Sequence, residues 1–154
     1  MTDQSKVQIR VMTPEDYDGI MALWKSIHGF GLRSIDDSRE GITRFLRRNP
    51  TTSVVAEDEG RIVGTILCGH DGRQACFYHV CVDEAYRQHH IGSRMTDFAV
   101  EALRREQINR VYLIAFKRNE VGNTFWQRIG WEFRQDRNYY ELYINEENRT
   151  VFSD

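Results

Sequence analysis

The most informative segment of this chain reads Val80-Cys81-Val82-Asp83-Glu84-Ala85-Tyr86-Arg87-Gln88-His89-His90-Ile91-Gly92-Ser93-Arg94-Met95. It begins as the apolar end of a strand, continues through a short polar loop and becomes a helix around Gly92. The first turn of a helix leaves backbone N–H groups without partners inside the helix, and the helix dipole adds about half a positive charge there. With Arg87 and Arg94 nearby in the sequence, the segment predicts a phosphate-binding site. An ordinary helix start would show the same pattern, because strand–loop–helix junctions with one glycine are common.

Turn and helix signals on both sides of this segment predict the rest of the fold. Two tight turns, Asp58-Glu59-Gly60 and Asp71-Gly72, join apolar runs into an antiparallel meander. Apolar residues at helical spacing predict helices over residues 14–27, 35–48, 91–103 and 121–129. The expected strands are residues 7–11, 53–57, 62–68, 75–82, 111–116, 131–133 and 139–144. The order β-α-α-β-β-β-α-β-α-β-β predicts a single α/β domain over residues 1–154, with a mixed sheet that is partly antiparallel and partly parallel.

Composition and charge exclude several classes of protein. The 154 residues carry 21 Lys+Arg against 23 Asp+Glu, a net charge of −2, which argues against a dedicated nucleic-acid binder. No apolar run approaches the roughly 18 residues of a membrane span, and the polar start Met1–Lys6 does not resemble a signal peptide. We therefore expect a soluble cytoplasmic protein that has neither nucleic acid nor a membrane as partner.

The three cysteines point to reduced thiols rather than to a disulfide framework. Cys68, Cys76 and Cys81 are odd in number and lie inside apolar, strand-like runs, where they would pack as small hydrophobic side chains. A zinc site made of Cys76, His79 and Cys81 is the alternative, but these residues lack the usual ligand spacing and would alternate between the two faces of a strand. We therefore expect no metal.

Three segments resemble one known family. Arg87-Gln88-His89-His90-Ile91-Gly92, after an apolar strand, resembles motif A of the GNAT N-acyltransferase superfamily, which reads Arg/Gln-x-x-Gly-x-Gly/Ala. The segment Asn119–Trp131 is similar to the family pattern Asn-x-x-Ala-x-x-Phe-Tyr-x-x-x-Gly-Phe, and Ile9–Asp16 is similar to its usual start. The resemblance covers nearly the whole chain. It implies a GNAT fold and an N-acetyltransferase that passes the acetyl group of acetyl-CoA directly to a primary amine of a small molecule or peptide.

The resemblance also implies which residues would hold acetyl-CoA. Backbone amides of the loop and helix start bind the pyrophosphate, the preceding strand end pairs with the pantetheine arm, and an Asn lies near that arm on its far side. A Trp stands here at the position of the family's Tyr, close to the leaving sulfur. The implied cofactor-binding residues are Val80, Cys81, Val82, Arg87, Gln88, His89, His90, Ile91, Gly92, Ser93, Asn119 and Trp126.

One departure from the family pattern lies in the loop itself. His90 stands where the family has Gly, and a left-handed backbone there would cost a residue with a side chain about 1 kcal/mol. A protonated imidazole contacting phosphate and a solvated loop side chain are both consistent with the sequence.

Acetyl transfer needs a neutral amine, stabilisation of charge on the thioester carbonyl and a proton for the leaving thiolate. The strand 75–82 contains no carboxylate, so His79 is the candidate base, although a lone His in an apolar strand is often structural. The backbone N–H of Val82 is the candidate for polarising the carbonyl. Tyr78, which would share strand parity with Val82, is a candidate acid or a packing residue, because the indole of Trp126 is too weak an acid.

Two further interpretations remain open. The departures at His90 and Trp126, together with the missing carboxylate, are consistent with a degenerate GNAT domain that binds acyl-CoA or a protein partner without turnover. Homodimers are frequent in this family, so the resemblance is also consistent with a homodimer. Aromatic side chains such as Tyr143 and Phe152 would then contribute to the interface.

Overall fold

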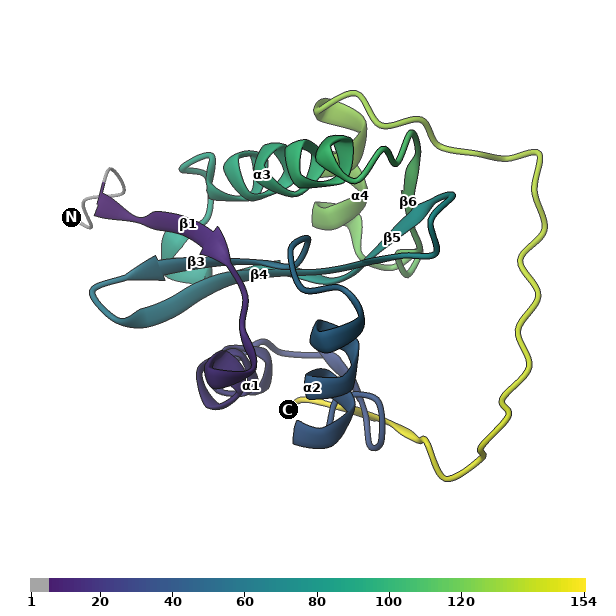
Figure 1. Cartoon of the computed structure of the whole chain (residues 1–154), viewed down its shortest axis with the longest axis horizontal. Helices are drawn as coiled ribbons and strands as arrows, with labels where there is room; N and C mark the ends of the chain where they lie inside the picture. Colours follow the sequence, from purple (N-terminus) through teal and green to yellow (C-terminus); the bar gives the residue numbers. More distant parts are fainter. Residues whose placement is uncertain (1–5) are drawn as a thin grey trace.

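A five-stranded sheet runs through the middle of the molecule in the order β1-β3-β4-β5-β6 (Figure 1). The structure is a computed structural model and describes residues 6–154. The strands of this sheet are β1 (Gln8–Val11), β3 (Val54–Asp58), β4 (Arg61–His70), β5 (Ala75–Val82) and β6 (Val111–Leu113). The first four pair antiparallel, and β6 joins β5 in parallel. The expected mixed α/β fold is therefore confirmed.

Helices cover both faces of this sheet (Figure 1). On one face lie α3 (Ile91–Arg105) and α4 (Glu120–Arg128), and on the other lie α1 (Tyr17–Ser26) and α2 (Arg39–Arg48). The apolar stripe of α3, including Met95 and Ala99, packs into one buried cluster. Trp24 of α1 and Ile42 of α2 belong to the second cluster on the opposite face. The sheet thus separates the molecule into an α3 side and an α1/α2 side.

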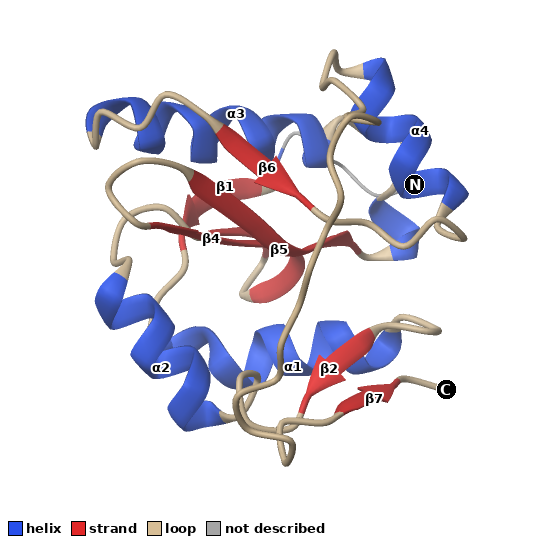
Figure 2. Ribbon diagram, turned by 90° about the vertical axis from the view of Figure 1, so that its right-hand side faces the viewer, coloured by secondary structure: helices blue, strands red, loops and turns tan. Residues whose placement is uncertain are grey.

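A second, two-stranded sheet was not expected from the sequence. Strand β2 (Gly31–Arg33) pairs antiparallel with β7 (Thr150–Phe152), close to the C-terminus (Figure 2). Gly31 is a strand residue whose added Cβ would lie 3.2 Å from the ring of Phe152. The glycine therefore allows the two short strands to approach each other.

Other boundaries differ from the expected ones. Helix α2 begins at Arg39 and not at 35, because the Ser38 hydroxyl accepts a hydrogen bond from the Gly41 amide (3.1 Å) and caps the helix. Strand β6 ends at Leu113 instead of 116. The expected strands 131–133 and 139–144 are wrong, since neither segment pairs with another strand. Two short 3-10 turns, Pro14–Asp16 and Glu84–Tyr86, precede α1 and α3.

Two expectations about the membrane can be compared with the structure in part. Every helix among residues 6–154 is too short or too polar to span a bilayer. The polar start of the chain, on which the absence of a signal peptide was argued, lies almost entirely in residues 1–5, outside the described residues.

Candidate active site

Strand β5 has an open backbone edge in its second half. Its parallel pairing with β6 covers only Ala75, Cys76 and Phe77. On the other edge, the Asp83 amide donates to the Val63 carbonyl (2.7 Å), and Val82 stands opposite Gly64. Because hydrogen-bonded and non-bonded pairs alternate in an antiparallel ladder, the Val82 amide points away from β4, toward the side of β6. This edge can pair with an extended ligand that carries amide groups.

The loop between β5 and α3 has a strained backbone. Gln88 (φ 66°) and His90 (φ 65°) both lie in the left-handed region. The left-handed backbone at His90 therefore carries the free-energy cost that we expected for a residue with a side chain. No side chain caps α3 at His90, so the amides of its first turn remain available to an external acceptor. The His90 and His89 side chains are exposed.

Arg87 and Arg94 make different contacts. The Arg87 Nε donates to the Val82 carbonyl (3.1 Å), which places its guanidinium between the open edge and the loop. The Arg94 guanidinium instead donates to the Val7 carbonyl (2.8 Å) and joins α3 to the start of β1. Arg94 therefore has a structural contact, although the sequence predicts that it adds charge at a phosphate site.

Gly92 is the point where α4 packs on the first turn of α3. A Cβ built at Gly92 would lie 3.2 Å and 3.3 Å from two ring atoms of Phe125. Ser93 follows in the same turn and is partly exposed. The glycine is therefore needed for close packing of the two helices as well as for free access to the neighbouring amides.

Gly92→Val is expected to weaken acetyl-CoA binding by about 2 kcal/mol, roughly a thirtyfold increase in Kd. The branched side chain must displace Phe125, which moves α4 and the amides at the start of α3. Isothermal titration calorimetry on the folded variant measures this, with Ser93→Ala as a control that adds no Cβ. Unchanged affinity for acetyl-CoA would remove this helix start from the binding site.

Asn119 and Trp126 have structural contacts in α4. The Asn119 side-chain oxygen accepts the Gly122 amide (3.0 Å) and caps the helix. The Trp126 ring packs against Trp131 (centroids 4.5 Å apart) and Phe77 (6.2 Å), on the α3 side of the sheet. Asn119 thus caps α4, and Trp126 holds it against the sheet.

A β-bulge interrupts β5 in the middle of the candidate site. The register of β4 and β5 shifts between Thr65 and Leu67, where two residues of β5, His79 and Val80, stand against one residue of β4. His79 has a φ of 48°. Val80 packs on the α3 side, whereas the neighbouring His79 ring lies between Trp24 and Phe30 on the α1/α2 side.

The bulge corrects the parity that we expected for Tyr78. Its ring meets Phe45 edge-on (6.0 Å) on the α1/α2 side, so Tyr78 and His79 point to the same side. Val82 packs on the opposite, α3 side. The premise that Tyr78 shares a face with Val82 is therefore wrong, because a bulge adds one residue to the period of two.

Tyr78→Phe is expected to keep kcat within about threefold of the wild-type value across the pH range. Burial raises the pKa of the Tyr78 phenol above its usual value, which makes it a poorer proton donor to a thiolate. Steady-state kinetics with acetyl-CoA and an amine acceptor measure this. A loss of tenfold or more would restore Tyr78 as the acid.

His79 contacts a carboxylate that the sequence analysis missed. Its Nε2 lies 2.9 Å from both Oδ1 and Oδ2 of Asp37, whose side chain is buried with only 5% of the residue exposed. Because a carboxylate only accepts hydrogen bonds, Nε2 carries the hydrogen, and Nδ1 of the neutral ring keeps its lone pair. Asp37 thus fixes the orientation of the His79 ring and holds the hydrogen on Nε2.

Further hydrogen bonds fix both partners of this pair. The Arg33 amide donates to Asp37 Oδ2 (2.7 Å), and the Tyr17 hydroxyl donates to the Asp37 carbonyl (2.8 Å). The buried Thr65 hydroxyl donates to the His79 carbonyl (2.7 Å) and accepts from the Trp24 indole (2.9 Å). These hydrogen bonds fix the positions of both Asp37 and His79.

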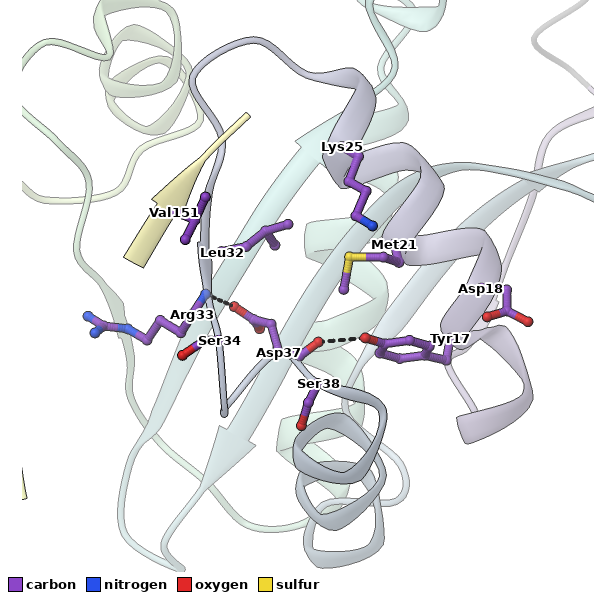
Figure 3. A pocket seen from close by; sticks show the side chains of 10 residues that line it. All are labelled: Tyr17, Asp18, Met21, Lys25, Leu32, Arg33, Ser34, Asp37, Ser38 and Val151. Atoms are coloured by element: carbon purple, nitrogen blue, oxygen red, sulfur yellow. Dashed lines mark hydrogen bonds between the residues drawn. The ribbon is translucent and has the colours of Figure 1, made fainter. Parts of the chain in front are cut away.

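A hollow of about 380 Å³ opens beside Asp37 on the α1/α2 side (Figure 3). Residues of α1, β2, the start of α2 and β7 line it, among them Tyr17, Lys25, Arg33 and Val151. Figure 3 shows Asp37 between the β2 side of the hollow and Tyr17 of α1. A ligand in this hollow would lie next to Asp37, the hydrogen-bond partner of His79.

The cysteines of the strands are not suited to act as bases. Burial raises the pKa of both Cys68 and Cys81 to about 12, so these thiols stay protonated at neutral pH. Within residues 6–154, no group of three His, Cys, Asp or Glu side chains lies close enough to hold a metal ion.

Comparison with known proteins agrees with this geometry. The model of the acetyltransferase (GNAT) family matches residues 17–131. An acetyltransferase of Pectobacterium atrosepticum is 24% identical over 126 residues, which are 82% of this chain and 88% of the relative. The N-acetyltransferase PaiA of Thermoplasma acidophilum, solved in complex with coenzyme A, has a TM-score of 0.72 at 15% identity and matches 85% of this chain and 92% of its own.

A glucosamine-6-phosphate N-acetyltransferase from Arabidopsis thaliana has the same fold, with a TM-score of 0.63 at 19% identity over 90% of this chain and 99% of its own. The family match extends over most of the chain and includes β5, the loop, α3 and α4. The resemblance inferred from the sequence is thus confirmed. The chain belongs to the acetyltransferase (GNAT) family and is an acyltransferase enzyme.

Proposed function

We propose that this single-domain enzyme, residues 1–154, transfers the acetyl group of acetyl-CoA directly to a primary amine of a small molecule or peptide in the cytoplasm. One observation carries the proposal: the bulge in β5 brings the open backbone edge and the His79–Asp37 pair to the same point of the strand. The acetyl donor would approach along the edge, and the amine would approach from the α1/α2 side.

The cofactor half of the site fits an extended thioester with a pyrophosphate. The strand edge Val80–Val82 would pair with the amide groups of the pantetheine arm, and the amides from Gln88 to Ser93 would receive the pyrophosphate. Arg87 would add positive charge between them. Asn119 and Trp126 would act through the position of α4. Acetyl-CoA supplies an activated acyl carbonyl and a thiolate leaving group.

The chemistry on the acceptor side rests on His79. Its Nδ1 takes a proton from the acceptor ammonium, either directly or through water, while Asp37 holds the hydrogen on Nε2. The amine nitrogen then forms a bond to the acetyl carbon, and the carbon–sulfur bond breaks. The Val82 amide faces the side on which the carbonyl oxygen gains charge. The nitrogen loses its second proton to water as the amide forms, and water supplies the proton that the thiolate takes up.

The hollow beside Asp37 favours a small acceptor or the end of a peptide. Its volume of about 380 Å³ lies in the range of small-molecule pockets. Lys25 and Arg33 bring cations to its wall, and Leu32 with Val151 supply apolar surface. No nucleic acid or membrane is needed as partner in this proposal.

Binding and turnover should be measured separately. Calorimetry should show acetyl-CoA binding, and a thermal-shift screen with acetyl-CoA present should show a second shift with one class among amino acids, polyamines, aminoglycosides and peptide N-termini. The amines that shift the melting temperature are then assayed for acetylated product. Affinity for acetyl-CoA with no product from any of these amines would contradict the proposed transfer.

A further inference from the structure

The hollow beside Asp37 contains charges of both signs. The charged side chains that line it are Asp18, Lys25, Arg33 and Asp37. Two of these have their counter-ions outside the hollow, because Asp18 pairs with Arg39 and Arg33 pairs with Glu141. Lys25 and Asp37 therefore decide which charges a ligand in the hollow would meet.

Lys25 supplies the positive charge. Figure 3 shows its side chain reaching from α1 toward Met21 in the hollow. Among residues 6–154, the Lys25 ammonium takes part in no ion pair and no hydrogen bond. This includes Asp154, which lines a neighbouring hollow together with Lys25. The ammonium thus keeps its three N–H donors for a ligand that carries an anion.

Asp37 supplies the negative charge. Its buried carboxylate accepts hydrogen bonds from the His79 ring (2.9 Å) and from the Arg33 amide (2.7 Å). Neither donor carries a positive charge when His79 is the neutral base of the proposed function, on which this inference rests. A buried carboxylate of this kind attracts a cation, because the dielectric constant around it is lower than that of water. The ammonium group of an acceptor would therefore approach this end of the hollow.

The remaining wall of the hollow offers mainly apolar surface. The hydroxyl groups of Tyr17, Ser34 and Ser38 all donate to main-chain carbonyls of the protein itself (2.6–2.8 Å). The apolar side chains of the lining are Met21, Leu32 and Val151, which we call the apolar wall. A ligand would thus meet the Lys25 ammonium, the Asp37 carboxylate and the apolar wall.

We propose that the acceptor is a free amino acid with an apolar side chain. Its α-ammonium would approach the Asp37–His79 pair, its carboxylate would accept hydrogen bonds from Lys25, and its side chain would lie against the apolar wall. A peptide N-terminus has a neutral amide in place of the carboxylate, and a simple amine has no polar group there. Neither would offer an anion to Lys25. The reaction is the transfer described above, and its products are an N-acetyl amino acid and coenzyme A.

Matched acceptors measure what the carboxylate contributes. Leucine, leucinamide and 3-methylbutylamine share one apolar side chain and differ in the group beside the amine. The kcat/KM for leucine should exceed the values for the other two at least about tenfold. Leucinamide is the strict comparison, since it holds more of its amine in the neutral, reactive form at a given pH. Methionine and phenylalanine are tested in the same way against their amides and amines. If none of the three amino acids is preferred, the proposal is wrong.

Lys25→Met tests the residue that would recognise the carboxylate. Met keeps the length of the side chain and removes its charge, so the KM for leucine should rise at least about tenfold. The kcat/KM for 3-methylbutylamine should stay within about threefold, and Lys25→Arg should keep most of the preference for leucine. Lys6→Met is the matched control, because Lys6 is exposed and lies outside the hollow. A folded Lys25→Met enzyme with the wild-type preference for leucine would overturn the assignment.

Calorimetry separates this inference from the proposed function. Leucine, methionine and phenylalanine are titrated into enzyme saturated with coenzyme A, which carries no acetyl group. At least one should bind, and about tenfold more weakly to Lys25→Met. Binding of this kind without acetylated product in the presence of acetyl-CoA would contradict the transfer and support the amino-acid site. Acetylation of other amines, with no binding of these three amino acids, would contradict the amino-acid site and leave the transfer intact.

Discussion

Replacing His79 by Gln is expected to lower kcat by about a hundredfold while the KM for acetyl-CoA stays within about threefold. Gln keeps a donor for Asp37 and a similar size between Trp24 and Phe30, but it cannot take a proton from the acceptor. The acetyl donor would bind to the backbone edge and loop, which the substitution leaves in place. Initial rates over a matrix of both substrate concentrations separate the two constants.

A second histidine substitution gives the comparison for His79, because a variant that removes an imidazole outside the site should keep kcat close to the wild-type value. His28→Gln is the matched control, since His28 is an exposed histidine outside the site. A His79→Gln enzyme with wild-type kcat would show that His79 is structural.

The region around His79 shows what the sequence could and could not predict. The helix at Ile91–Arg105 followed from an apolar stripe, and the β3–β4–β5 meander followed from two turns, because both signals are local. His79 stood out as the residue of its strand suited to proton transfer near neutral pH. The side to which Tyr78 points did not follow, because the bulge depends on the partner strand β4.

Residues 139–144 and Asp37 show the same limit in two other forms. Residues 139–144 have the composition and alternation of a strand, and the structure keeps that alternation, but the pattern does not say which strand would pair with it. Asp37 lies 42 residues before His79 and falls in a range that we expected to be helix. A signal was present in Asp37-Ser38, because Ser is a common helix cap and moves the start of the helix past Asp37.

Asp37→Asn is expected to lower kcat by about 10-fold to 100-fold through its effect on the ring of His79. The Arg33 amide donates to Asp37 Oδ2, so an Asn at this position would keep its carbonyl oxygen on that donor and turn its NH₂ group toward His79 Nε2. Nε2 would then accept the hydrogen bond, the ring hydrogen would move to Nδ1, and the base would lose its lone pair on the acceptor side.

A double-mutant cycle distinguishes this positioning role from a loss of structure. If Asp37 acts through His79, Asp37→Asn should cost almost nothing further in a His79→Gln background, because no imidazole is left to orient. Asp36→Asn is the neighbouring control, since the Asp36 carboxylate is bonded to Asn148 and not to His79. The melting temperature of each variant reports its folding. Equal losses of kcat in both backgrounds, accompanied by a lower melting temperature, would mean that Asp37 supports the loop before α2 and does not set the tautomer of His79.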